Sequence, residues 1–186
     1  MLFLLGRYEA ALDSCQTSID LDPKSVYAWR SRGNALNNLE RYEEALAACN
    51  QALRIEPKNH KALNSQALTL SFLKDFEKAI TAINQAINLK PQQVLYQANR
   101  GIILARAGRY TEALADCEQA IKQDPKHVSG YYGKACCYAL QREVEQAIDN
   151  LKTAMDIAPR LCRREARHNP DFDSIRDEEG FRALVE

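Results

Sequence analysis

The chain has 186 residues, enough for one packed domain or a short array of repeats. Its 25 basic and 25 acidic side chains cancel, so no overall charge directs it to nucleic acid or to a membrane surface. A hydrophobic content of 46% with few glycines and prolines excludes a disordered chain. The apolar start MLFLLG lacks a basic segment and is too short for a signal peptide or a membrane span. We therefore expect a cytoplasmic protein.

A proline recurs at a fixed interval of 34 residues along most of the chain. The prolines in this register are Pro23, Pro57, Pro91, Pro125 and Pro159. Because proline lacks an amide hydrogen and clashes with the preceding turn, each of them ends a helix. Between two such prolines the apolar residues follow three- and four-residue steps twice, as in Val26–Glu40 and then from Tyr42 to Ile55. The period predicts an all-α chain of helix pairs.

Small residues occupy one equivalent place on each helix of a pair. On the first helix they are Gly33, Ala67, Gly101 and Ala135. On the second helix they are Ala11, Ala45, Ala79, Ala113 and Ala147. Small side chains at both places let the two helix axes approach closely, so each pair is expected to pack as a tight hairpin.

These positions resemble the tetratricopeptide repeat, in which an aromatic residue, glycine, alanine and proline recur at set intervals. The matching residues are Trp29, Gly33, Leu36, Ala45, Cys49, Ala52 and Pro57. Arg32 stands where leucine is usual and Cys49 where an aromatic is usual. The resemblance covers about residues 1–159 and implies a right-handed superhelical solenoid of antiparallel helix pairs. It also implies a non-catalytic scaffold that binds a protein or peptide partner on its concave face.

The predicted domain organisation follows the 34-residue period. Complete repeats are expected at 26–59, 60–93, 94–127 and 128–161, after a truncated first repeat at 1–25. In that first repeat, MLFLL would end a lost helix and Tyr8–Leu21 would form the second helix. Two alternative functions follow from this truncation. The chain would be a regulatory or targeting segment cut from a larger enzyme, or it would self-associate through an exposed Met1–Leu5 edge.

The tail breaks the repeat and is expected to form a helical cap at 162–186. We predict a helix over Pro159–His168, a turn at Asn169-Pro170 and a short helix over Glu178–Val185. Four apolar side chains would cover the last repeat: Phe172, Ile175, Phe181 and Leu184. The segment DPDFD resembles caps that close repeat groups in some bacterial members of the family.

The six cysteines are interpreted as structural free thiols. Cys15, Cys49 and Cys117 share a repeat position that is Ile83 or Leu151 elsewhere, so the position is an apolar packing site. Equivalent sites in neighbouring repeats lie roughly 10 Å apart, too far for a disulfide. A disulfide or a zinc site remains the alternative. No catalytic or phosphate-binding motif is present, so we expect no enzyme activity, no cofactor and no metal site.

The binding groove is predicted one step around each first helix from the residues that face its partner helix. Its residues are Tyr27, Arg30, Asn34, Asn37, Asn38, Lys61, Asn64, Ser65, Phe72, Asn99, Ile102, Arg106 and Tyr132. The early part is polar and would take a polar or acidic peptide portion near Arg30–Lys61. The later part would take an apolar portion near Ile102–Tyr132. The alternative is that Leu95, Ile102 and Leu140 belong to the core between the helices or are covered by the tail.

The residues bear on two more specific partners, an acidic chaperone tail and nucleic acid. Some family members bind acidic chaperone tails through a carboxylate clamp, but only Arg30 and Asn34 fit its pattern, whereas Ser65, Leu95 and Asn99 do not.

The second is nucleic acid, because a basic stripe recurs at three- and four-residue steps in the tail: Arg160, Arg163, Arg164 and Arg167. Acidic residues follow it at once and no aromatic side chains interleave, so a solvated, balanced cap is favoured and no nucleic-acid partner is expected.

Overall fold

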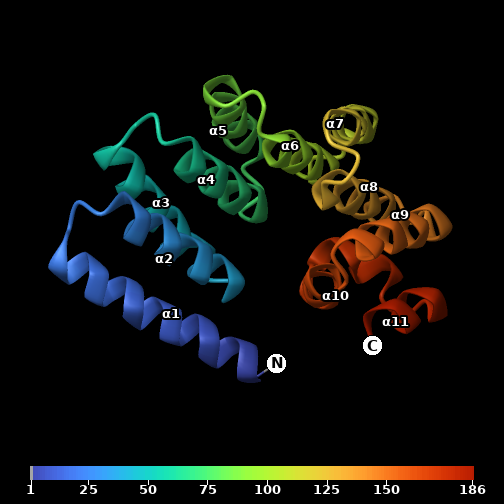
Figure 1. The fold of residues 1–186 in the computed structure, drawn as a ribbon, viewed down its shortest axis with the longest axis horizontal. Helices are drawn as coiled ribbons and strands as arrows, with labels where there is room; N and C mark the ends of the chain where they lie inside the picture. Colours follow the sequence, from blue (N-terminus) through green and yellow to red (C-terminus); the bar gives the residue numbers. More distant parts are fainter. Residues whose placement is uncertain (1) are drawn as a thin grey trace. The chain divides into compact units, whose positions relative to one another are not determined.

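The computed structural model describes the backbone of residues 2–186 and the side chains of residues 7–186. Within this described part the chain is helical and contains no strand. It divides into two compact units, Met1–Pro91 and Gln92–Glu186. Figure 1 draws the first unit from blue to green and the second from green to red. No helix among the described residues is long and apolar enough to cross a membrane.

The first unit contains five helices with one packing scheme. They are α1 (Leu2–Leu21), α2 (Val26–Asn38), α3 (Tyr42–Ile55), α4 (His60–Phe72) and α5 (Phe76–Leu89). The pairs α2–α3 and α4–α5 form antiparallel hairpins, as Figure 1 shows. Helix α1 packs on α2, α3 packs on α4, and α2 also contacts α4.

The second unit repeats the scheme and then adds the tail. Its helices are α6 (Val94–Arg106), α7 (Tyr110–Gln123), α8 (Val128–Leu140), α9 (Val144–Ile157), α10 (Pro159–His168), the 3₁₀ helix η1 (Pro170–Ile175) and α11 (Glu179–Val185). The hairpins are α6–α7 and α8–α9, and η1 lies on α8 while α10 packs on α9. The predicted elements of the tail are present within one residue at each end.

The start of the chain differs from the prediction. Helix α1 runs without a break from Leu2 to Leu21, whereas MLFLL was expected to end one helix and Tyr8–Leu21 to form the next. A hairpin turn gains its stability from packing between the helices on both sides of it. A continuous helix instead satisfies the backbone hydrogen bonds locally. The expected Met1–Leu5 edge involves side chains that lie outside the described residues.

Each hairpin turn uses one residue with a positive φ. These residues are Glu40 (φ 59°), Lys74 (61°), Gly108 (77°) and Arg142 (61°), again spaced by the repeat. The amide after each of them donates to a carbonyl five residues back, as from Arg41 to Leu36 at 2.9 Å. This left-handed termination satisfies a carbonyl that the helix end leaves open and turns the chain toward the second helix.

The small residues on the first helices set the closest approach within a hairpin. A Cβ added at Gly101 would lie 2.6 Å from Cys117 Sγ and 2.9 Å from the carbonyl oxygen of Ala113. At Gly33 the corresponding distance to Cys49 Sγ is 2.8 Å. Cys49 and Cys117 are themselves fully buried. Glycine is therefore required at these two places because the sulfur atom occupies the space of a methyl group.

We expect Gly101→Ala to lower the free energy of unfolding by about 1–3 kcal/mol, the usual cost of overpacking a core. The gain in helix propensity, about 1 kcal/mol, offsets only part of it. Urea unfolding followed by circular dichroism measures the effect. The double variant Gly101→Ala/Cys117→Ala lacks the sulfur atom and therefore the nearer clash. Its loss in unfolding free energy should be smaller than the sum of the losses of the two single variants. Wild-type stability of the single variant would contradict the close packing.

All six cysteines are free thiols in the structure, and all but Cys15 are buried. Burial raises the pKa of the thiols of Cys49, Cys137 and Cys162 to about 11. The pKa of Cys136 is raised well above its ordinary value by burial and by the nearby Asp171 carboxylate. Cys15 is half-buried. The buried thiols with a raised pKa are poor nucleophiles, because the thiolate is the reactive form.

Thiol titration with Ellman's reagent at pH 8 tests this burial. A thiol with a pKa near 11 is ionised only to about one part in a thousand at that pH. We expect the folded protein to react rapidly at Cys15 alone, and all six thiols to react in guanidinium. The variant Cys15→Ser should remove the rapid phase. A second rapidly reacting thiol in the folded state would show that the helix pairs open.

Candidate interaction surfaces

Helices α2 and α4 lie side by side in the first unit and share a polar surface, which we call the α2/α4 wall. It consists of Tyr27, Arg30, Asn34, Asn37, Asn38, Lys61, Asn64, Ser65 and Thr69. All except Thr69 were predicted for the groove. Thr69 was not predicted. It lies one helical turn after Ser65 but is fully buried, and a threonine in the sequence does not by itself indicate a binding surface.

Two pairs of hydrogen-bonded side chains connect the helices of the α2/α4 wall. Ser65 Oγ donates to Asn34 Oδ1 at 2.8 Å. Asn37 Nδ2 donates to Thr69 Oγ1, also at 2.8 Å. Ser65 and Thr69 are buried, so these bonds are shielded from water and hold both asparagines in one orientation. The wall is therefore a fixed polar surface rather than a set of mobile side chains.

The outer end of the α2/α4 wall is exposed. Tyr27 is 72% exposed, and the guanidinium carbon of Arg30 lies 5.3 Å from the centre of its ring. A cation at this distance from an aromatic ring is attracted to its face. Lys61 is exposed on the neighbouring helix. The charged end of the wall is thus open to solvent.

Phe72, at the end of α4, lies in a different environment. Its ring is stacked on that of Tyr42 with the ring centres 4.8 Å apart. It is half-buried, so it contributes to the packing between hairpins of the first unit as well as to the predicted groove.

The four predicted groove residues of the second unit contact the core and the tail. Asn99 is 8% exposed. Ile102 and Tyr132 pack against the buried cluster that includes Phe172. Arg106 forms a paired contact with the Asp171 carboxylate, at 2.8 and 2.9 Å. These contacts agree with the alternative in which the tail covers the later part of the groove.

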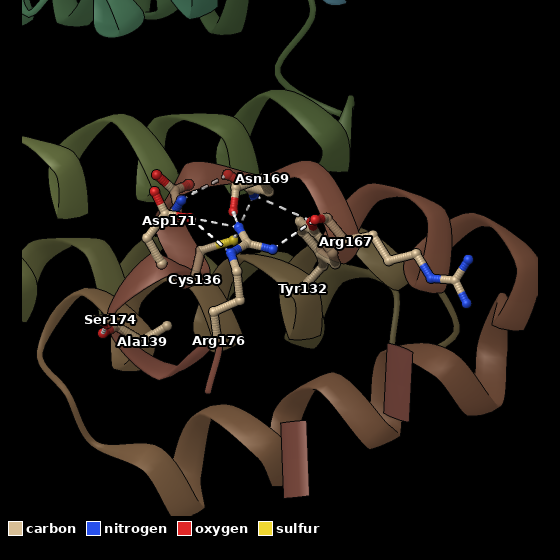
Figure 2. Close-up of polar contacts among 9 residues, drawn as sticks. Tyr132, Cys136, Ala139, Arg167, Asn169, Asp171, Ser174 and Arg176 are labelled. Carbon is tan, nitrogen blue, oxygen red and sulfur yellow. Dashed lines mark hydrogen bonds and ion pairs between the residues drawn. The ribbon is translucent and has the colours of Figure 1, made fainter. Parts of the chain in front are cut away.

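The tail is held to α8 by a polar network, shown in Figure 2. Asn169 donates from Nδ2 to the Tyr132 hydroxyl at 3.2 Å and to Cys136 Sγ at 3.4 Å. Ser174 donates to the carbonyl oxygen of Ala139. Arg176 donates to the carbonyl oxygens of Arg167 and Asn169, which fixes the turn between α10 and η1. Burial raises the pKa of Tyr132 well above its ordinary value, so the hydroxyl stays neutral.

The apolar part of the tail behaves as predicted. Phe172, Ile175 and Phe181 are buried against α8 and α9, and Leu184 is partly buried beside them. Phe172 meets Tyr132 edge to face with the ring centres 5.8 Å apart. The residues 170–185 thus supply part of the core of the second unit.

The basic stripe of α10 is used within the tail. Arg163 donates to the carbonyl oxygen of Leu184 at 3.0 Å, and Arg167 donates to the carbonyl oxygens of Val185 and Glu186. Cations at a helix C-terminus are stabilised by its open carbonyl groups. Arg164 pairs with Glu165. These contacts favour the balanced cap over a nucleic-acid surface. Among the described residues no group of three or more His, Cys, Asp or Glu side chains is placed to hold a metal ion.

Three family models with the description tetratricopeptide repeat match the chain, over residues 26–59, 64–127 and 104–166. The chain belongs to the tetratricopeptide repeat family. It is accordingly an all-helical repeat protein of the solenoid class and a protein-interaction module.

Solved structures show the same fold. YrrB, a tetratricopeptide repeat protein with an unusual peptide-binding site, is 26% identical, with a TM-score of 0.55 over 87% of this chain and 84% of that one. PilW, a widely conserved type IV pilus biogenesis factor, is 18% identical, with a TM-score of 0.67 over 96% and 91%. MamA is 16% identical, with a TM-score of 0.60 over 84% and 91%. No curated protein matches the chain significantly.

The ion pair between Arg106 and Asp171 gives a sharp test of the tail contact. The side chains are 11% and 4% exposed, so Asp171→Ala would remove the carboxylate that pairs with a largely buried guanidinium. We expect a loss of about 3–5 kcal/mol in unfolding free energy. The double variant Arg106→Leu/Asp171→Ala should be more stable than Asp171→Ala, because it also removes the buried positive charge.

The exposed pair Arg109–Glu112 provides the matched control for this measurement. Its side chains are 42% and 58% exposed. Glu112→Ala should change the unfolding free energy by less than about 1 kcal/mol. An equally small effect of Asp171→Ala would show that the tail detaches from α6 in solution.

Proposed function

We propose that the chain is a non-catalytic module that binds an extended peptide segment of a partner protein on the α2/α4 wall. The observation that carries this proposal is the pair of fixed hydrogen bonds, Asn34–Ser65 and Asn37–Thr69, beside an exposed Tyr27–Arg30 end. The peptide-binding site named for YrrB, 26% identical to this chain, supports a peptide as the ligand class.

The chemistry of the α2/α4 wall suits a peptide backbone. Asn34 uses its Oδ1 atom to accept from Ser65, and its Nδ2 donor has no side-chain partner within the described part of the chain. A peptide carbonyl would accept from this donor with little loss of side-chain entropy, because the asparagine is already held in place. The wall would then read the backbone rather than one particular side chain.

Two cations, the half-buried Arg30 and the exposed Lys61, add a preference for acidic groups. Arg30 and Lys61 lie on neighbouring helices, and among the described residues no acidic side chain forms an ion pair with either of them. A carboxylate binds well to arginine through two parallel hydrogen bonds. The ligand is therefore proposed to carry an acidic residue at the end that lies near Tyr27 and Arg30.

The proposal also limits the site to the first unit. Arg106 and Tyr132, which were expected to bind an apolar part of the ligand, contact Asp171 and Asn169 of the tail. A ligand of the α2/α4 wall therefore needs no apolar portion for the second unit.

The proposed site is tested by selecting peptides from a display library against the intact chain and then measuring their affinity by calorimetry. For a selected peptide, Arg30→Ala and Asn34→Ala should each weaken binding about tenfold, as expected for the loss of one hydrogen bond. The loss at Arg30 should shrink as salt is added, because an exposed ion pair is screened. The amide Gln146, exposed on α9, serves as the control, and Gln146→Ala should bind as the wild type does. Unchanged affinity of both wall variants would remove the α2/α4 wall from the account.

A further inference from the structure

A pocket of about 540 Å³ lies in the first unit between α3 and α5, against α4. This volume is within the range of about 300–1,000 Å³ that ligand pockets usually have. Leu46, Leu70 and Leu73 form an apolar floor. The amides of Asn50, Gln66 and Gln85 are part of the polar rim.

The pocket opens on another face of α4 than the α2/α4 wall. Gln66, Leu70 and Leu73 follow helical steps of four and three residues, so they share one face. Ser65 and Thr69, which bond to α2, lie about 100° around the same helix. A ligand in the pocket therefore contacts α3 and α5 rather than α2.

The repeat supplies an internal comparison for the pair Gln66–Asn50, whose members are 16 residues apart. In two other repeats the residues at the equivalent positions are also hydrogen-bonded to each other. These pairs are Arg32–Gln16, with Arg32 on α2, and Lys134–Glu118, with Lys134 on α8. Both of those pairs contain a long cationic side chain. At the pocket, both members are short and uncharged.

The floor also differs between the units. Tyr138 of α8 stands in the register place of Leu70, and the ammonium group of Lys134 lies 6.0 Å from the centre of its ring. The second unit therefore carries a larger ring and a longer cation at these two places. The smaller residues Leu70 and Gln66 leave the corresponding region of the first unit open.

The lining defines the chemistry of a ligand. Gln66 Nε2 donates to Asn50 Oδ1 at 2.7 Å, which leaves Gln66 Oε1 as an acceptor and Asn50 Nδ2 as a donor without a bonded partner in the described part of the chain. Asp75 and Lys78 neutralise each other at 2.6 Å. The bonded pair Gln66–Asn50 thus offers an acceptor and a donor beside an aliphatic floor, and the pocket carries no net charge.

We propose that this pocket is a second binding site, for an uncharged extended peptide segment with one aliphatic side chain. The aliphatic side chain lies on Leu46, Leu70 and Leu73. The adjoining backbone carbonyl accepts from Asn50 Nδ2, and the adjoining backbone N–H donates to Gln66 Oε1. A charged side chain is disfavoured, because the floor would desolvate it without a partner. The site does not depend on the α2/α4 wall.

Nuclear magnetic resonance titration with capped tripeptides tests the site. The probes are acetyl-Ala-Leu-Ala-amide and the same peptide with Glu or Lys in the middle. The leucine probe should cause saturable shifts of the side-chain amide signals of Asn50, Gln66 and Gln85. The two charged probes should bind at least about tenfold more weakly. Equal binding of all three probes, or shifts confined to other residues, would overturn the proposal.

A double variant provides the matched test, because it copies a pair that the second unit already contains. Asn50→Glu/Gln66→Lys reproduces the Lys134–Glu118 pair and should fill the pocket while keeping the bond between α3 and α4. Its circular dichroism should match the wild type, and its binding of the leucine probe should fall at least about tenfold. Wild-type affinity in this variant would overturn the proposal.

Two controls separate this site from the α2/α4 wall. Asn34→Ala should leave the binding of the leucine probe unchanged, because Asn34 lies on α2. A peptide selected for the wall should keep its affinity for Asn50→Glu/Gln66→Lys. If Asn34→Ala lost the ability to bind the leucine probe, the probe would bind at the α2/α4 wall, and the proposed second site would be wrong.

Discussion

The close approach of the two helices in each hairpin is the constraint on which the rest of the structure depends. Gly33 and Gly101 leave no room for a methyl group, since the sulfur atoms of Cys49 and Cys117 already occupy that space. Ala67 and Ala135 hold the equivalent places where the second helix carries Ile83 and Leu151. The tight hairpin fixes the direction of every first helix, and it is these first helices that carry the α2/α4 wall. The cysteines are therefore packing residues, and their raised pKa values are a consequence of burial rather than a sign of chemistry.

The two units use the same helix surface in different ways. In the first unit the side chains between α2 and α4 bond to one another and leave an exposed, charged end. In the second unit the corresponding helices α6 and α8 are contacted by η1 through a buried ion pair and an aromatic cluster. A tail of fewer than 30 residues thus converts a repeat surface into core. This division supports a binding function that is concentrated in the first unit.

The polar residue that departs from the family pattern has a structural consequence in each repeat. Arg32, Gln66, Arg100 and Lys134 share the place where leucine is usual. Each of them bonds to a side chain of a second helix, and Arg100 does so through both oxygens of Asp116. Where the residue is long and cationic, its charged end reaches the side chain of its partner on another helix. Where it is Gln66, the residue lines a pocket, so a substitution in one repeat can change the surface without changing the fold.

The sequence by itself determined the helix pairs, their period, the two helices of the tail and the apolar character of the repeat position that Cys49 and Cys117 share. These follow from local rules: proline ends a helix, apolar steps mark its buried face, and a site that accepts Cys, Ile or Leu is apolar. Only the tertiary structure decided which groove residues remain available. Arg106 and Asp171 are 65 residues apart, and no local pattern pairs a helix residue with a carboxylate of the tail. Nor does the sequence reveal the pocket at Gln66, because its volume depends on how far the side chains of three helices extend into one shared space. Local propensity specifies the elements, whereas occupancy of a surface depends on contacts between distant residues.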